Sequence, residues 1–513
     1  MRRPLAAVLA LAGTVAGAAC GGPGYAPGTP EAAAHARADS LLDTPGPPVG
    51  LERAQRLRFP SLRFDPPEPE RFELSNGATV IFLHDPALPL VDLFITLKGG
   101  YVYEGREYYA ASGALLPLMR NGGTTTLTAD SLDALIDFHA LGMSTSTDGS
   151  RMSLGISALS RQLDLAIGLW SDILLRPRFD ADAAERWRLR ELEAVRRRVD
   201  FPGSLAVVEF NRLFFGDHPN GWIMAESDLS PERLSAARLR ALHGRVVCPD
   251  RAVIGVAGDV SRERLRQALE DAFAGWEPCG GELEPPPPPT LRADPTVYVI
   301  HRPIPQSTVV VGQPGGVLMD ESPDYFASRV ANWVIGGSGF TSRLVGRLRT
   351  EEGLAYSAAS IWGAARRYER IFGAITHTKT ESTVPAARVM LETLAGSRDE
   401  PPTGEEVRLA REAIVNGFVF GFDSPVQVVA RQVTYEADGL PRDWLARYLA
   451  GVRDVDSTSV AAVIRKTVRP GAFTVLIVGD TTAFDASELG PVVPLTGEAG
   501  RRNAAGPAAR SRR

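Results

Sequence analysis

Histidines are the side chains best suited to bind a transition metal or to move a proton near neutral pH. No two of the seven histidines lie three or four residues apart, the spacing that puts two ligands on one face of a helix. The chain also has no G-x-S-x-G segment, which would place a serine nucleophile on a sharp turn. Each histidine is therefore expected to be structural or exposed. The seven are His35, His84, His139, His218, His243, His301 and His377.

Cysteine chemistry is limited to three residues, Cys20 near the N-terminus and Cys248 and Cys279 far along the chain. Two distant cysteines are too few for a cysteine-based metal site, and no pairing of a cysteine with a histidine is apparent. The sequence leaves open whether Cys248 and Cys279 form one disulfide bond, because that bond depends on the distance between their Cα atoms.

The composition excludes several classes of function. The 513-residue chain is 44% hydrophobic and 23% charged, as in ordinary globular proteins. Its 56 basic and 61 acidic residues give a net charge of −5, so a general attraction to nucleic acid or anionic lipid is not expected. The glycine-rich stretch at 336–339 lacks the Gly-Lys-Ser/Thr ending of a phosphate-binding loop, and we expect a turn there.

The elements that must position any site fall into two similar halves. Five consecutive prolines at 285–289 predict an extended spacer between them. The apolar run at 79–84 returns at 296–301, an offset of 217, and the run that begins at Pro249 returns at Pro470, an offset of 221. Near-equal offsets at both ends indicate a duplicated domain. The alternative is two unrelated domains with similar strands.

Each half is predicted to be α+β, with an antiparallel-rich sheet covered by helices on one face. Alternating apolar residues predict a strand at 91–97 and hairpins at 144–157 and at 356–378. Apolar residues at helical spacing predict helices elsewhere. The expected helices are 110–120, 131–141, 163–175, 182–199, 325–335, 342–351 and 405–420.

The N-terminus has the pattern of an export signal. Two arginines precede a short apolar stretch and then small residues, as in a secretory signal peptide. Cys20 after Gly-Ala-Ala resembles a bacterial lipobox, which favours acylation of Cys20 and a periplasmic, lipid-anchored protein; ordinary cleavage after Ala18 is the alternative. The predicted parts are a signal peptide (1–20), a flexible tether (21–65), a first domain (66–281), a Pro-rich linker (282–295), a second domain (296–488) and a disordered tail (489–513).

The segment 340–357, which reads FTSRLVGRLRTEEGLAYS, resembles the second-domain signature of the insulinase/pitrilysin-type zinc peptidases, the inverzincins. Two shorter features fit the same family, the Asn-Gly opening at 74–77 and the Gly-Asp-His-Pro run at 216–219. The resemblance extends over roughly residues 70–485. It implies two homologous domains that form half of a peptidase clamshell.

Active members of this family carry an inverted H-x-x-E-H zinc motif on a helix of the first domain. Counting back from Gly123-Thr124 places that motif on residues 114–118. Ala114, Pro117 and Leu118 stand where the two histidines and the glutamate would be, so no metal is expected here. The third ligand would fall on or beside Ala194, next to Glu193.

The resemblance also implies a role for Arg349 and Tyr356. In two-chain bacterial members, one subunit holds zinc and the other supplies an arginine and a tyrosine from its second domain. Arg349 and Tyr356 match these two residues, and their donors suit a peptide carbonyl and its developing oxyanion. The alternative is that Arg349 pairs with Glu351 or Glu352 and that Tyr356 packs in a sheet.

These features predict a non-catalytic, substrate-binding subunit of a two-chain zinc peptidase that acts on unfolded peptides in the bacterial cell envelope. Zinc is expected in a homologous partner subunit, and this chain alone is expected to be inactive. A second hypothesis is a catalytically inactive member kept as a structural or assembly scaffold. An autonomous hydrolase is disfavoured, because the ligand positions are apolar.

Overall fold

A computed structural model describes residues 66–291 and 293–497. The predicted signal peptide with Cys20, the tether up to residue 65 and His35 lie outside these ranges. Within them, no single helix is long and apolar enough to cross a membrane. Two helical segments pass that test only when taken together, and they are bent by 110° at the break between them.

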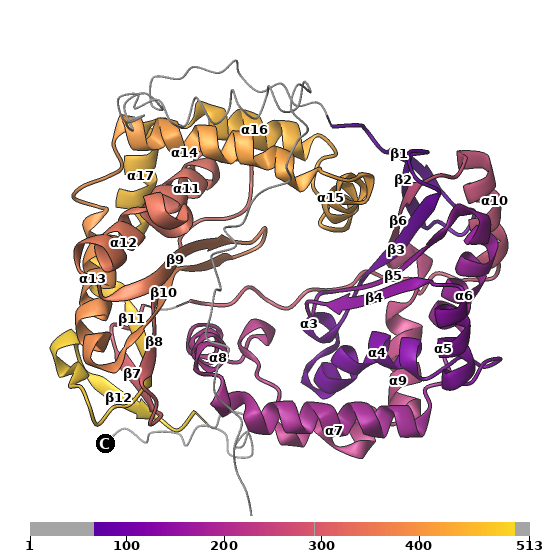
Figure 1. Ribbon diagram of the computed structural model, residues 1–513, viewed down its shortest axis with the longest axis horizontal. Helices are drawn as coiled ribbons and strands as arrows, with labels where there is room; N and C mark the ends of the chain where they lie inside the picture. The colour runs from indigo at the N-terminus through magenta and orange to yellow at the C-terminus, as the bar shows by residue number, and fades with distance from the viewer. Residues whose placement is uncertain (1–65, 292, 498–513) are drawn as a thin grey trace, which may run out of the picture. The chain divides into compact units, whose positions relative to one another are not determined.

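The first sheet has six strands in the order β1-β2-β6-β3-β5-β4 (Figure 1). β2 and β6 are parallel, and the remaining neighbours pair antiparallel. The predicted hairpin at 144–157 is β4 with β5. The strands are β1 (Glu70–Glu73), β2 (Thr79–His84), β3 (Leu90–Lys98), β4 (Gly142–Thr147), β5 (Arg151–Leu159) and β6 (Ala252–Gly258).

The second sheet has the order β12-β7-β11-β8-β10-β9, so five strands repeat the order and pairing of the first sheet. β9 and β10 form the predicted hairpin at 356–378. The sixth strand differs, because β12 comes from the C-terminal side and pairs parallel with β7. The strands are β7 (Val297–His301), β8 (Gln306–Pro314), β9 (Ala355–Ala364), β10 (Glu369–Lys379), β11 (Thr474–Gly479) and β12 (Val492–Leu495).

β12 corrects one expectation from the sequence. Residues from 489 onward were expected to be a disordered tail, yet Val492–Leu495 pair with Val297–Ile300. The Gly/Pro-rich composition of this segment predicts disorder, but its residues 492–495 form a strand by pairing with β7 at the edge of the second sheet. The predicted tail is therefore wrong for 489–497, and the remainder lies outside the described residues.

The described helices divide between the two halves, and most of them pack on one face of their own sheet and form its main core. Those of the first half are α3 (Tyr101–Glu104), α4 (Tyr109–Asn121), α5 (Ala129–Phe138), α6 (Leu163–Leu175), α7 (Ala181–Arg197), α8 (Pro202–Phe215), α9 (Ala236–Val246) and α10 (Arg262–Ala272). Those of the second half are α11 (Pro323–Asn332), α12 (Arg343–Val345), α13 (Thr383–Gly396), α14 (Gly404–Gly417), α15 (Pro425–Ala437), α16 (Trp444–Asp454) and α17 (Ser457–Thr467). The α+β fold class is confirmed.

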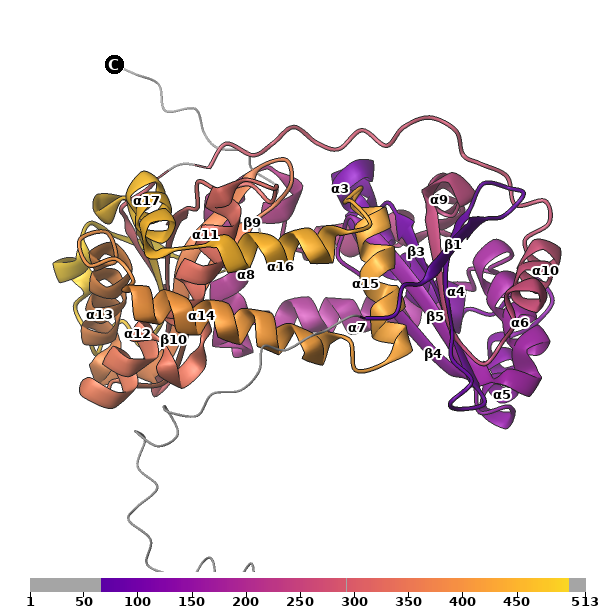
Figure 2. The ribbon, with the colours of Figure 1, turned by 90° about the horizontal axis from the view of Figure 1, so that it is seen from above.

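The opposite face of each sheet is covered by a helix from the other half. α8 packs on β8 and β11 of the second sheet, and α15 packs on β2 and β6 of the first. Figures 1 and 2 both place α8 beside the second sheet and α15 beside the first. The expectation of helices on a single face is therefore wrong. The central strands explain the arrangement, because β6 is buried along six of its seven residues and β11 along its whole length.

Each exchanged helix contributes a compact apolar cluster. Phe210 and Phe214 of α8 pack with Val310, Leu476 and Val478 of the second sheet. Val429 and Val433 of α15 pack with apolar residues of the first sheet, namely Ile81, Val253 and Ala257. Each cluster contains apolar side chains from both halves, and their burial holds the two halves together.

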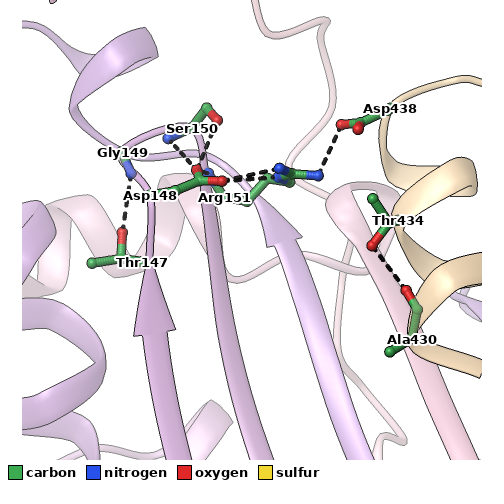
Figure 3. A network of polar contacts seen from close by, with 8 residues as sticks. All are labelled: Thr147, Asp148, Gly149, Ser150, Arg151, Ala430, Thr434 and Asp438. Carbon is green, nitrogen blue, oxygen red and sulfur yellow. Dashed lines mark hydrogen bonds and ion pairs between the residues drawn. The ribbon is translucent and has the colours of Figure 1, made fainter. Parts of the chain in front are cut away.

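Ion pairs hold the C-terminal end of α15 against the first sheet. The Arg71 guanidinium lies 3.0 Å from a carboxylate oxygen of Glu436. Arg151, at the start of β5, donates to Asp148 in its own hairpin turn and to Asp438 just after α15 at 3.0 Å (Figure 3). Each pair joins a strand of the first half to the end of a helix from the second.

A disulfide bond joins Cys248 and Cys279, whose Cα atoms are 5.6 Å apart. The structure thus selects the bonded alternative that the sequence left open. The Asp250 carboxylate accepts the backbone N–H groups of Cys279 and Gly280, each at 3.1 Å. These contacts fix the point where the Pro-rich linker leaves the first half. Between α10 and β7 the described residues form neither helix nor strand, as expected for that linker.

The helix exchange predicts a large stability loss on Phe210→Ala. Phe210 is 4% exposed and lies close to the backbone of β8 at Gly312. Its truncation leaves a cavity between α8 and the second sheet, so the free energy of unfolding should fall by about 3–5 kcal/mol. Urea unfolding followed by circular dichroism measures the loss.

Val207→Ala on the same helix is the matched control, because Val207 is 44% exposed. That change should alter the free energy of unfolding by no more than about 0.5 kcal/mol. Equal, small effects of both substitutions would contradict the packing role of α8.

Candidate functional site

The positions of the expected zinc motif lie on α4 and are part of the core. Ala114, Leu115 and Leu116 are at most 1% exposed, and Leu118 is 2% exposed. Pro117 lies inside α4 and is half-buried. These side chains pack in the main apolar cluster of the first half and offer no metal ligand and no base.

The region of the third ligand is on α7. Glu193 and Ala194 are both exposed, and the next residue, Val195, is buried in the core. Trp187, also on α7, is 6% exposed and packs beside Gly113 of α4. A Cβ atom added to Gly113 would lie 3.7 Å from the Trp187 ring. Apolar packing thus joins α4 and α7, the two helices on which the expected ligands would lie.

Within the described residues, one cluster of three side chains has the spacing of metal ligands, namely Cys248, Asp250 and Cys279. Its two sulfur atoms are bonded to each other. A sulfur in a disulfide is not the thiolate that binds metal. This cluster is therefore not a preformed metal centre.

Each of the six described histidines hydrogen-bonds to a neighbouring group, as expected for structural residues. Burial lowers the pKa of His218 and of His243, which keeps both rings neutral near pH 7. The partners are Val260 O for His84, Gln162 for His139, the Asn220 N–H for His218, Leu174 O for His243, Thr481 for His301 and Thr308 for His377.

The Arg349 guanidinium lies over two aromatic rings. Arg349 lies in η10 (Gly346–Glu351), a π-helical segment that follows α12. Its guanidinium carbon is 4.3 Å from the ring centre of Phe340 and 4.5 Å from that of Tyr356. Its Nη1 is buried and has no hydrogen-bond partner among the described residues.

Within the described chain Arg349 makes no ion pair with Glu351 or Glu352, so the alternative suggested by the sequence is wrong. The guanidinium contacts both rings, and its hydrogen-bonding capacity is not used up. The sequence analysis paired Arg349 with Tyr356 but assigned no role to Phe340. Its 71% exposure is the signal of a site residue, and exposure is not readable from the sequence.

A β-bulge turns Tyr356 out of the sheet. Thr378 of β10 faces Ala355, and the next residue, His377, faces Ser357, so Tyr356 has no opposite residue in the ladder. Tyr356 is 77% exposed and lies on β9, the edge strand of its sheet. Bulges re-aim side chains in this way and are common beside functional sites. Tyr356 therefore does not pack within the sheet.

Contacts with α14 anchor the helical segment that carries Arg349. Arg343, at the start of α12, makes two hydrogen bonds of 2.6–2.7 Å to the carboxylate of Glu406. The same carboxylate accepts from Thr403, which caps α14. The Arg343 guanidinium, followed by the bonds from Thr403, lowers the pKa of Glu406 to about 2. The start of the α12–η10 segment is thus held by a charged pair.

Comparisons with known proteins agree with this arrangement. A family model described as "Peptidase M16 inactive domain" matches residues 233–414. An uncharacterized zinc protease of Mycobacterium leprae is 26% identical over 359 residues, which is 69% of this chain and 79% of that protein. The non-peptidase homolog YmxG of Helicobacter pylori is 24% identical over 278 residues, 54% of this chain and 63% of that protein.

A solved structure has a similar fold. The crystal structure of a peptidase M16 inactive domain from Pseudomonas fluorescens superposes with a TM-score of 0.70 at 22% identity, covering 81% of this chain and 98% of that one. At this identity the likeness shows the fold alone.

The Glu406 pKa predicts a specific pH dependence of stability. Because the folded-state pKa of about 2 lies below the ordinary value of 4.5, the stabilisation is fully present above about pH 5 and is lost as the pH falls toward 2. The difference in free energy of unfolding between the wild type and Glu406→Gln should therefore shrink between pH 6 and pH 3. Urea unfolding across this range measures it.

Glu412→Gln is the control, because Glu412 lies on the same helix and pairs with Arg408 on the exposed surface. A surface pair contributes little, so this variant should differ little from the wild type at any pH. The same pH trend in both variants would assign the effect to overall charge and contradict the role of Glu406.

The packed motif positions predict that the isolated chain binds no zinc. After incubation with zinc and dialysis, metal analysis should find far less than one zinc per chain, because the motif positions on α4 offer only apolar side chains. One zinc per chain, retained against dialysis, would show that a site had been missed.

Proposed function

We propose that this chain, which belongs to the M16 (insulinase-type) peptidase family, is the non-catalytic, substrate-binding subunit of a two-chain zinc peptidase. One observation carries the proposal. The motif positions on α4 are packed as core, while Arg349 and the bulged Tyr356 stay on the surface with donors available. A chain kept only for its fold has no need of an arginine with an unpaired donor beside two exposed rings.

The chemistry of the site suits a peptide backbone. Arg349 offers several fixed N–H donors and Tyr356 one O–H donor, and both suit a carbonyl oxygen that gains negative charge during hydrolysis. Stacking on Phe340 and Tyr356 limits the rotamers of the long arginine side chain, so less entropy is lost when it binds. Zinc in the partner subunit supplies the activated water.

The proposal places the protein in the bacterial cell envelope, where its substrates are unfolded peptides. The Cys248–Cys279 disulfide supports export, because structural disulfides persist in oxidising compartments. The export pattern before Cys20 supports the same location, with acylated Cys20 as the proposed membrane anchor.

The test combines the purified chain with a homologous partner from its own host that carries H-x-x-E-H. Neither chain alone should cleave an unstructured fluorogenic peptide, and the mixture should cleave it in a chelator-sensitive reaction. Arg349→Ala should lower kcat/KM by about 100-fold, the usual loss for one oxyanion donor. Tyr356→Phe, which removes one hydroxyl, should lower it about ten-fold.

Arg347→Ala is the matched control. Arg347 lies in the same π-helical segment but pairs with Glu392 at 2.8 Å, away from the aromatic stack. Its loss should leave kcat/KM unchanged. Full activity of the Arg349 and Tyr356 variants would refute the assigned roles. An inert complex of well-folded chains would refute the peptidase role and leave the scaffold as the function.

A further inference from the structure

A second site lies in the C-terminal part of the second half, and it shares no residue with the Arg349 stack. A cavity of about 640 Å³ is bounded by α11, α15, α16 and η12 (Phe418–Gly421). Its volume is in the range of pockets for small organic ligands. The aromatic side chains that line it are Tyr325, Phe418, Tyr435, Trp444 and Tyr448.

Arg431 of α15 is the charged donor of this cavity. Its guanidinium carbon lies 5.2 Å from the ring centre of Phe418 and 5.4 Å from that of Phe422. In the described part of the chain it makes no ion pair and no hydrogen bond, although most arginines of this protein pair with a carboxylate or a carbonyl. An added Cβ at Gly421 would lie 2.8 Å from its Nη2, so the glycine leaves room for the group.

Three phenol groups add further donors. Tyr325 is 7% exposed and Tyr435 is 5% exposed, and Tyr448 is half-buried. None of the three hydroxyls hydrogen-bonds to another described residue. Burial raises the pKa of Tyr435 and of Tyr448 to about 12, so both remain protonated near neutral pH. These hydroxyls line the cavity and are free to donate to an acceptor group of a ligand there.

The other polar side chains that line the cavity have hydrogen-bond partners within the protein. The Asp438 carboxylate accepts from Arg151 at 3.0 Å, and the Thr434 hydroxyl donates to the Ala430 carbonyl at 2.8 Å (Figure 3). The side-chain oxygen of Gln427 accepts the backbone N–H of Asp423. The unsatisfied groups are therefore donors, one of them charged, inside aromatic walls.

We propose that this cavity binds an oxyanion, and specifically the carboxylate of a small organic acid with an aromatic or branched apolar body. Arg431 forms the ion pair, and the hydroxyls of Tyr435 and Tyr448 donate to the same anionic group. Trp444 and Phe418 pack against the apolar body. The proposal is independent of the peptidase function, because it uses neither Arg349 nor a partner subunit.

The experiment uses the purified chain and isothermal titration calorimetry with a matched pair of probes. N-acetyl-phenylalanine carries the carboxylate, and N-acetyl-phenylalaninamide has the same body without the charge. The acid should bind one per chain, and the amide at least about ten-fold more weakly, since a charged hydrogen bond is lost. Inorganic phosphate is the third probe. Its binding at equal strength would identify a free anion as the ligand source.

Arg431→Met keeps the length of the side chain and removes its charge, and it should weaken binding of the acid by at least about ten-fold. Arg408→Met is the control, because Arg408 pairs with Glu405 and Glu412 on the exposed face of α14. Tyr448→Phe, which preserves packing, gives a second test if Arg431→Met fails to fold. Absence of binding up to about 10 mM for acid and phosphate alike, or binding that neither variant weakens, overturns the proposal.

Discussion

The reciprocal cover of the two sheets is the interaction on which the rest of the structure depends. The central strands β6 and β11 are apolar on both faces, so each sheet needs two layers of helices. Each half supplies only one layer to its own sheet and gives a helix to the other. A half without its exchanged partner would expose the residues around Val253 or Leu476 to water. The two halves therefore form one folding unit, although they derive from a repeat.

Apolar packing also fills the positions on α4 where the resemblance places a zinc motif. A zinc site needs polar ligands with exact geometry, and its removal leaves buried polar groups that must be paired or replaced. On α4 the replacement is complete, because Ala114 and Leu118 belong to the apolar core and Trp187 of α7 packs beside Gly113. The contact between these helices then depends on packing alone. The stack around Arg349 lies on the second half, where this replacement has no influence.

The sequence predicted those parts of the fold that depend on local pattern. Alternation predicted the hairpins of β4–β5 and β9–β10, and the near-equal offsets predicted the duplicated domain that appears as a repeat of five strands. The exchange of α8 and α15 could not be predicted in this way, because periodicity shows that a helix has an apolar face and not which sheet covers it. β12 was missed for a related reason: four residues become a strand only when β7 lies beside them.

In the candidate site too, residue types could be predicted from the sequence, but features that depend on contacts between elements could not. The residue types of Arg349 and Tyr356 were readable from a motif, but the exposure of Tyr356 depends on the register of β9 against β10. The bulge at Tyr356 arises because Ala355 and Ser357 face consecutive residues of β10, a relation between strands that no single segment records. Phe340 joins the stack only because η10 brings Arg349 back toward it.

The helix α15 contributes to two separate parts of the structure, the cover of the first sheet and the cavity of the second half. Val429 and Val433 face the first sheet, whereas Arg431 and Tyr435 line the cavity of the second half. Positions two apart on an α-helix differ by about 200°, so the two pairs lie on opposite sides of one helix. The same geometry couples the two regions, because any ligand that holds Arg431 also holds the helix that covers the first sheet.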